Sequence, residues 1–161
     1  MTNPDSTRRA AGLAMMLLVS SMPGRMIAQQ VTLAGPPIHQ EADFAVAPAK
    51  VYQALVNQAQ FRAFSGMAAT LSAAVGGSFT IFGGHIVGRQ LELVPGKRVV
   101  QAWRTVDWPV GIWSVVRFEL EARGTGTHLV FDQTGFPEGE RASLSAGWES
   151  HYWSLLKTYL H

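Results

Sequence analysis

The feature that most constrains the fold is a long stretch, residues 70–133, in which apolar and polar residues alternate between glycine and proline turns. Alternation of this kind is typical of strands that bury one face of a sheet. With an earlier alternating run at 38–46, it predicts about seven strands, six of them consecutive. The consecutive strands are expected at 70–73, 78–82, 85–94, 98–104, 112–122 and 127–133. Such short turns favour an antiparallel meander with one face in water.

Three other segments predict helices. Pro48 opens a helix over 49–56, where a proline at the first helical position loses no hydrogen bond, and a second short helix covers 58–64. The closing segment, 138–160, is expected to form one helix about 30 Å long, at about 1.5 Å per residue. Its predicted apolar stripe consists of Leu144, Trp148, Tyr152, Leu155 and Tyr159, widened by Trp153, Leu156 and Leu160.

Together these elements predict an α+β fold. A curved antiparallel sheet of about seven strands surrounds the long C-terminal helix, and two short helices follow the first strand. The 161 residues suggest one domain, placed at 38–161. A curved sheet around one helix leaves a central gap, which we expect to be an apolar cavity. Gly147, inside the helix, predicts a close approach of another group to that helix face.

The first 28 residues resemble a secretory signal. Arg8 and Arg9 precede an apolar run at 10–22, which is too short to cross a bilayer. The paired arginines suggest the twin-arginine route, so we expect an exported, periplasmic protein with no transmembrane helix in its mature form. The alternative is a cytoplasmic protein with a misplaced start codon, initiated at one of the methionines within this segment.

Charge and cysteine content exclude several classes of function. The chain has 13 basic and 11 acidic residues, and the excess lies in the first 28 residues, so the remainder is neutral. A nucleic-acid partner is therefore not expected, since such binding needs clustered basic residues. The absence of cysteine excludes disulfides, thiolate metal sites and a cysteine nucleophile.

Five segments resemble, in order, the activator of heat-shock protein 90 ATPase homologue family. They are residues 48–55, 64–66, 76–79, 91–104 and 147–153, and the resemblance covers about 38–160. It implies the START-like (SRPBCC) helix-grip fold. The family includes small bacterial proteins of unknown role and the C-terminal domain of a eukaryotic co-chaperone, which implies a possible chaperone partner. That co-chaperone also needs an N-terminal domain, for which the 28 signal-like residues leave no room, so fold is implied more strongly than activity.

Candidate ligand-binding residues are those expected on the inner faces of sheet and helix. Gln133 is in register with Leu129 and Phe131, so its amide should point inward, to be satisfied by backbone or by a ligand. Arg104 follows Trp103 and should therefore face outward and pair with an acid. The cavity candidates are Phe64, Phe82, Trp103, Phe118, Phe131, Gln133, Trp148 and Tyr152.

No catalytic or metal site, and no cofactor, is expected. The five histidines lack the spacing of metal ligands, and residues 145–147 lack the first glycine of a nucleophile elbow. Glu119 and Glu121 share a strand face with Arg117, which favours a solvated charged face over a catalytic pair.

The first functional hypothesis is therefore a non-enzymatic module that binds a small hydrophobic molecule or a lipid. A protein-interaction role like that of the co-chaperone domain is the second. A cyclase or dehydratase is a distant third, because it needs an acid or base inside the pocket, and His151 and Tyr152 are the candidates there. A solvent-exposed His151 would argue against the enzyme.

Overall fold

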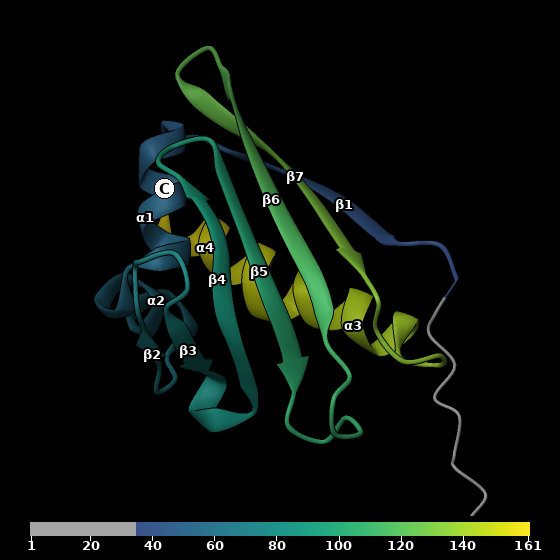
Figure 1. Ribbon diagram of the computed structural model, residues 1–161. Helices are drawn as coiled ribbons and strands as arrows, with labels where there is room; N and C mark the ends of the chain where they lie inside the picture. The colour runs from purple at the N-terminus through teal and green to yellow at the C-terminus, as the bar shows by residue number, and fades with distance from the viewer. Residues whose placement is uncertain (1–34) are drawn as a thin grey trace, which may run out of the picture.

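The computed structural model describes residues 35–161, and the predicted signal segment lies outside these residues. Seven strands in this part form one antiparallel sheet in the order β1-β7-β6-β5-β4-β3-β2 (Figure 1). The strands are β1 (Ile38–Phe44), β2 (Thr70–Leu71), β3 (Ser78–Ile81), β4 (Ile86–Val94), β5 (Arg98–Thr105), β6 (Ser114–Arg123) and β7 (Gly126–Thr134). The predicted fold class, a helix-grip arrangement, is confirmed.

The sheet buries one face, as the alternation predicts. In β6 the residues at alternate positions from Ser114 to Leu120 are buried, while Arg117 and its neighbours on the other face are more exposed. Phe118 is paired with Phe131 of β7 in the strand register, and their ring centroids lie 5.2 Å apart. The inner face of the central strands is therefore strongly aromatic.

Two short helices follow β1 and close one end of the sheet (Figure 1). Helix α1 (Pro48–Val56) begins at the predicted proline, and α2 (Gln58–Ser65) follows after Asn57. The Asn57 side chain accepts hydrogen bonds from the first backbone N–H groups of α2, which caps that helix. Gly66, at φ 68°, ends α2 in the left-handed conformation that glycine adopts without strain.

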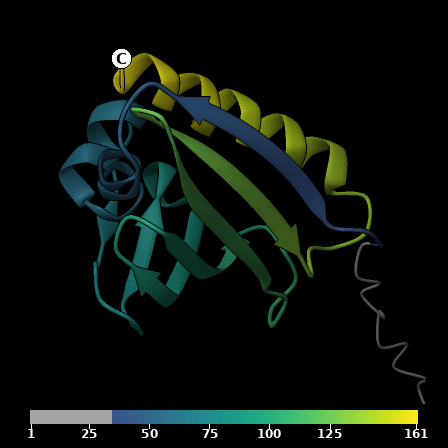
Figure 2. The ribbon, with the colours of Figure 1, turned by 90° about the horizontal axis from the view of Figure 1, so that it is seen from above.

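The C-terminal helix lies along the concave side of the curved sheet (Figure 2). It consists of α3 (Arg141–Trp148), a π-helical turn η2 (Glu149–Trp153) and α4 (Ser154–Tyr159). A 3-10 turn, η1 (Phe82–Gly84), joins β3 to β4. In residues 35–161 no helix is long and apolar enough to span a membrane.

The π turn changes which helix positions face the core. The backbone N–H of Ser154 donates to the carbonyl of Glu149, five residues back, so the turn holds one residue more than an α-turn. The buried positions are Leu144, Trp148, Tyr152, Trp153, Leu156 and Leu160. The predicted stripe is confirmed for Leu144, Trp148 and Tyr152 and for Trp153, Leu156 and Leu160, but it is wrong for two residues: Leu155 is only partly buried and Tyr159 is 37% exposed. The extra residue rotates both toward solvent.

Gly88, in the middle of β4, has no side chain, so the ring of Phe79 on β3 can lie directly against the β4 backbone at this position. A Cβ atom at this position would overlap the Phe79 ring and the carbonyl oxygen of Ala102 on β5. The Phe79 ring is 2% exposed, so it has no room to withdraw. This close approach fixes how β3 packs at the end of the sheet.

The outer face of the sheet carries a row of ion pairs across four strands. Arg98 donates to Glu119 at 2.8 Å, and Arg117 donates to Asp132 at 2.7 Å. His39 Nδ1 lies 2.8 Å from the Asp132 carboxylate. Hydrogen bonding to Asp132 raises the pKa of His39, and hydrogen bonds from Arg117 and His39 hold the pKa of Asp132 below its usual value despite partial burial.

Gly88→Ala is expected to destabilise the fold by about 2 kcal/mol or more, because the added methyl group overpacks a closed site. Urea unfolding monitored by tryptophan fluorescence measures the change. An unchanged free energy of unfolding would mean that Phe79 does not cross Gly88 as described.

The row of ion pairs predicts a pH dependence at His39. The pKa of His39 in the folded protein is raised above its ordinary value of 6.5. The protonated ring therefore stabilises the fold fully at pH values below 6.5, and this stabilisation is lost as the pH rises through the folded-state pKa. An NMR titration of the His39 ring should give a midpoint above 6.5 that falls toward 6.5 in Asp132→Asn. A wild-type midpoint at or below 6.5 would contradict the Asp132 contact.

Candidate functional site

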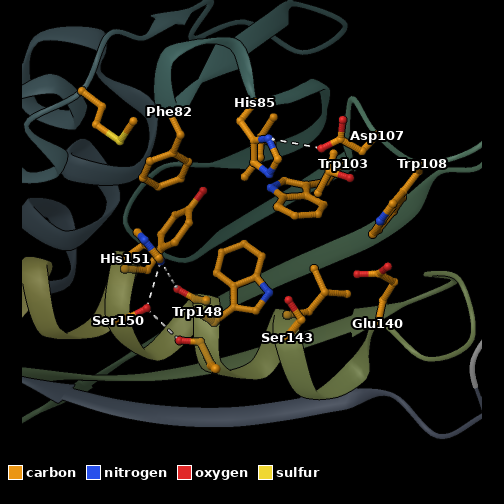
Figure 3. A pocket seen from close by; sticks show the side chains of 17 residues that line it. Phe82, His85, Trp103, Asp107, Trp108, Glu140, Ser143, Trp148, Ser150 and His151 are labelled. Atoms are coloured by element: carbon orange, nitrogen blue, oxygen red, sulfur yellow. Dashed lines mark hydrogen bonds and ion pairs between the residues drawn. The ribbon is translucent and has the colours of Figure 1, made fainter.

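A cleft of about 640 Å³ lies between the C-terminal helix and the end of the sheet where β4 begins and β5 ends (Figure 3). The sheet side contributes residues from η1, β4, β5 and the loop after β5, and the helix side contributes residues from Glu140 to Tyr152. The apolar and aromatic wall consists of Met67, Phe82, Ile86, Trp103, Trp108, Leu144, Trp148 and Tyr152. The cleft is thus a largely apolar site in the size range of small-molecule pockets.

The predicted central hollow is filled. Trp148 lies with its ring centroid 4.2 Å from that of Phe131 and 5.5 Å from that of Trp103. Phe118 also packs edge-on against Trp148, at 5.8 Å. These rings interlock at the middle of the sheet, so the cleft lies to one side of them.

The predicted cavity residues therefore divide into two groups. Phe82, Trp103, Trp148 and Tyr152 line the cleft. Phe118 borders only a separate void of about 10 Å³, and Phe64, Phe131 and Gln133 line neither space. Phe64 packs against Phe61 at 4.7 Å and against Tyr152, and Phe131 is completely buried among other rings, so both belong to the solid core.

Gln133 differs most from its predicted role, because its amide is used inside the protein. Its Oε1 accepts a hydrogen bond from Trp148 Nε1 at 2.7 Å, and its Nε2 donates to Ser114 Oγ at 2.9 Å. Ser114 Oγ in turn donates to the backbone carbonyl of Trp103 at 2.8 Å. This relay joins the helix to β7, β6 and β5, and the amide does not face the cleft.

Phe82 holds a strained position at the cleft wall. Its φ of 52° is the one positive value among the non-glycine residues described. The ring packs edge-on against Phe61 at 5.4 Å and against Tyr152 at 5.3 Å. Packing on both sides therefore maintains a backbone conformation that an aromatic residue rarely adopts.

The loop between β5 and β6 contributes a wall that the sequence analysis missed. Trp108 is 5% exposed and packs edge-on against Trp103 at 5.7 Å. The Trp108-Pro109 pair, an aromatic residue at a turn, was the available signal. Arg104 was expected to pair with an acid, but it donates to the backbone carbonyls of Thr105 and Trp108 and lies over the Trp113 ring at 5.6 Å. It therefore holds this loop in shape.

The ionisable residues of the cleft lie at its exposed edge (Figure 3). His85 Nδ1 is 3.6 Å from Asp107 Oδ2, and both side chains are more than half exposed. His151 is exposed, with Nδ1 2.9 Å from Ser150 Oγ. Glu140 completes the set, and no lysine or arginine is among the described residues that line the cleft. In residues 35–161 no cluster of three or more acidic, histidine or cysteine side chains is arranged to hold a metal.

Two polar groups lie in the inner wall. Burial raises the pKa of the Tyr152 hydroxyl well above its usual value, and the nearby Trp103 indole N–H offsets this only in part. The Trp103 N–H is itself buried, yet it forms no hydrogen bond of ordinary geometry with any described residue. The wall thus offers a neutral hydroxyl and an unsatisfied N–H donor.

Gly147 borders the cleft on the helix side. A Cβ atom there would meet nothing within 4 Å, so the close approach expected at this glycine is absent, and that prediction is wrong. The space beside Gly147 belongs to the cleft instead.

The family model described as "Activator of Hsp90 ATPase homolog 1-like protein" matches residues 45–161. The chain belongs to this family. The predicted family resemblance is thereby confirmed over nearly the whole described part of the chain.

Members of the family in eukaryotes are clearly related in sequence. The activator of 90 kDa heat shock protein ATPase homolog 1 from Homo sapiens is 30% identical over 114 residues, which is 71% of this chain and 34% of that protein. The homolog from Dictyostelium discoideum is 32% identical over 116 residues, or 71% of this chain and 30% of that protein. The chain therefore spans about a third of the length of these relatives.

The fold also matches solved structures. An HSP90 activator from Plasmodium falciparum superposes with a TM-score of 0.75 at 22% identity, covering 78% of this chain and 96% of that one. At this identity the likeness supports the fold alone, which is the START-like helix-grip arrangement of the family.

Gln133→Met is expected to destabilise this family member by about 2 kcal/mol, because the Trp148 N–H is left buried without a partner. The loss should be smaller in a Trp148→Phe background, where that N–H is gone. Chemical denaturation of the unmodified protein, the two single variants and the double variant measures both effects. Equal losses in the two backgrounds would show that the Gln133–Trp148 hydrogen bond contributes nothing.

Gly147→Ala is expected to stabilise the chain by up to about 1 kcal/mol, since alanine favours the helix and its methyl group meets open space. Thermal unfolding should show a raised midpoint. A lowered midpoint would mean that another group does approach this helix face.

Proposed function

We propose that the chain is a non-enzymatic binding module that takes up a small hydrophobic molecule or a lipid in the cleft. The observation that carries the proposal is the cleft of about 640 Å³ with mainly aromatic and aliphatic walls, beside a core whose rings interlock. Protein interiors are usually densely packed, because atoms beside unfilled space lose favourable van der Waals contacts. An apolar ligand would restore those contacts.

The distribution of ionisable groups supports binding over catalysis. A cyclase or dehydratase needs an acid or base beside the bound substrate. His151 is exposed, His85 and Asp107 pair at the edge, and burial keeps the Tyr152 hydroxyl protonated. The inner cleft thus presents a binding surface whose one titratable group, the Tyr152 hydroxyl, stays neutral, while both histidines and Asp107 lie at the edge.

The test is occupancy of the cleft and its loss when the cleft is filled. Native mass spectrometry of the purified protein should detect a copurified ligand, and the neutral dye Nile red should bind and be displaced by small apolar molecules. Gly147→Leu places a side chain in the cleft and should weaken dye binding at least about tenfold, as expected when a ligand loses its contact surface.

Ala142→Leu is the matched control, because Ala142 is exposed on the same helix and does not line the cleft. It should bind the dye like the unmodified protein. The proposed function would be refuted if the unmodified protein neither bound the dye nor carried a copurified ligand. It would also be refuted if the two variants bound the dye equally well.

A chaperone partner is the second candidate, and family membership together with the human relative favours it. The test is the ATPase rate of a bacterial chaperone of the Hsp90 class with and without the chain, together with a pull-down. A stimulated rate and a retained complex would support this role. If both are absent, the chaperone role fails. Gly147→Leu should leave any stimulation unchanged, which separates this role from ligand binding.

A further inference from the structure

We propose that the cleft selects uncharged, flat apolar molecules that carry a hydrogen-bond acceptor oxygen, such as an aryl ketone, and that Trp103 and Tyr152 donate to that oxygen. This inference rests on the proposed function, because it names the class of ligand that the cleft would hold. Three features of the cleft carry it: an unsatisfied donor, a neutral hydroxyl and the absence of a positive side chain among the described residues that line it.

The first feature is the Trp103 indole N–H. The residue is 3% exposed, and its buried nitrogen lies near the Tyr152 hydroxyl but forms no hydrogen bond of ordinary geometry with any described residue. Buried donors are nearly always satisfied in folded proteins, so an orphaned one calls for a partner. Trp148, by contrast, has its N–H satisfied by Gln133 at 2.7 Å. Because an indole can only donate, the missing partner of Trp103 must be an acceptor.

The second feature is the Tyr152 hydroxyl, which the Trp103 N–H approaches without forming a hydrogen bond of ordinary geometry. Tyr152 is 4% exposed and comes from the π turn of the helix, whereas Trp103 comes from β5. Burial keeps the hydroxyl protonated and able to donate. An oxygen that enters beside the Tyr152 hydroxyl would accept from the helix, and it would accept from the sheet as well once the rings shift enough to uncover the buried Trp103 nitrogen.

The third feature is the charge of the lining. The described residues around the cleft include Asp107 and Glu140, and two histidines at the edge, but no lysine or arginine. An anionic ligand would lose its hydration without gaining a permanent positive partner, and it would face two carboxylates. Fatty-acid carboxylates are therefore disfavoured, and an uncharged polar group is favoured.

The walls of the cleft indicate the shape of the ligand. The rings of Trp103 and Trp108 lie edge to face on the sheet side of the cleft, and Trp148 lies on the helix side (Figure 3). The centroids of Trp103 and Trp148 are 5.5 Å apart, so these two rings touch and form one continuous aromatic wall, and the Tyr152 ring packs on Trp148 at 4.3 Å. Aromatic faces and edges in this arrangement pack well on a flat ring system. A planar ring that carries a carbonyl matches both the walls and the donors.

The experiment compares three probes of nearly equal shape: 2-acetylnaphthalene, 2-isopropylnaphthalene and 2-naphthoate. Their dissociation constants are measured at pH 7 by displacement of Nile red from the full chain. Tyr152→Phe and Trp103→Phe, which each remove one donor, should weaken binding of the ketone about fivefold to tenfold more than binding of the hydrocarbon. Tyr159→Phe is the matched control, because Tyr159 is partly exposed and does not line the cleft. The naphthoate should bind at least about tenfold more weakly than the ketone.

A second measurement uses the unmodified protein, so it does not depend on whether Trp103→Phe folds. The infrared carbonyl stretch of bound, carbon-13-labelled 2-acetylnaphthalene should lie below its value in an aprotic solvent, because hydrogen bonding weakens the carbonyl bond. A stretch at the aprotic value would overturn the proposed contact with Trp103 and Tyr152.

The outcomes separate the inference from the function on which it rests. If neither neutral probe binds, the binding function itself fails. If both bind and donor removal changes their affinities in equal proportion, or not at all, the cleft binds apolar molecules but the donor pair does not select the oxygen. Tight binding of the naphthoate would overturn the charge argument.

Discussion

The hydrogen bond between Trp148 and Gln133 is the contact on which the rest of the structure depends. It is buried, 2.7 Å long, and continues through Ser114 to the backbone of Trp103. The relay sets the rotation of the helix relative to three strands, which nondirectional packing of rings alone would not do. Once Trp148 is fixed, its ring fills the space beside Phe131 and the centre of the domain becomes solid.

A solid centre displaces the cavity to the end of the sheet. There the walls are a 3-10 turn, a loop and the helix together with the start of β4 and the end of β5, so regular strand pairing no longer fills the space. Arg104 keeps the loop in place through backbone carbonyls, and the π turn brings Tyr152 and Trp153 both into the interior. Trp153 is also tied to β1, since its N–H donates to Gln40 at 2.7 Å. The cleft is thus bordered by irregular segments that are each held by specific contacts.

The sequence was sufficient for the elements and their order, because alternation and helical periodicity are local properties. It was insufficient where one residue changes the geometry. The π turn inserts a residue that no periodicity reveals, so the periodicity places Leu155 and Tyr159 inward although both turn toward solvent. For Gln133, the pattern predicted an inward amide correctly, but the choice between a protein partner and a ligand depends on Trp148, which lies 15 residues away. The buried position of Trp108 could not be predicted, because residues in a loop follow no repeating pattern of apolar positions.

The cleft itself is difficult to explain by stability alone. Gly147 leaves a helix position without a side chain beside open space, although alanine there would favour the helix by up to about 1 kcal/mol. Trp103, which lines the same cleft, keeps a buried donor without a hydrogen bond of ordinary geometry, which also costs free energy. A domain that only presented an outer surface to a protein partner would gain by removing both features. Their occurrence in one cleft is consistent with a bound molecule that occupies the space and accepts the hydrogen bond.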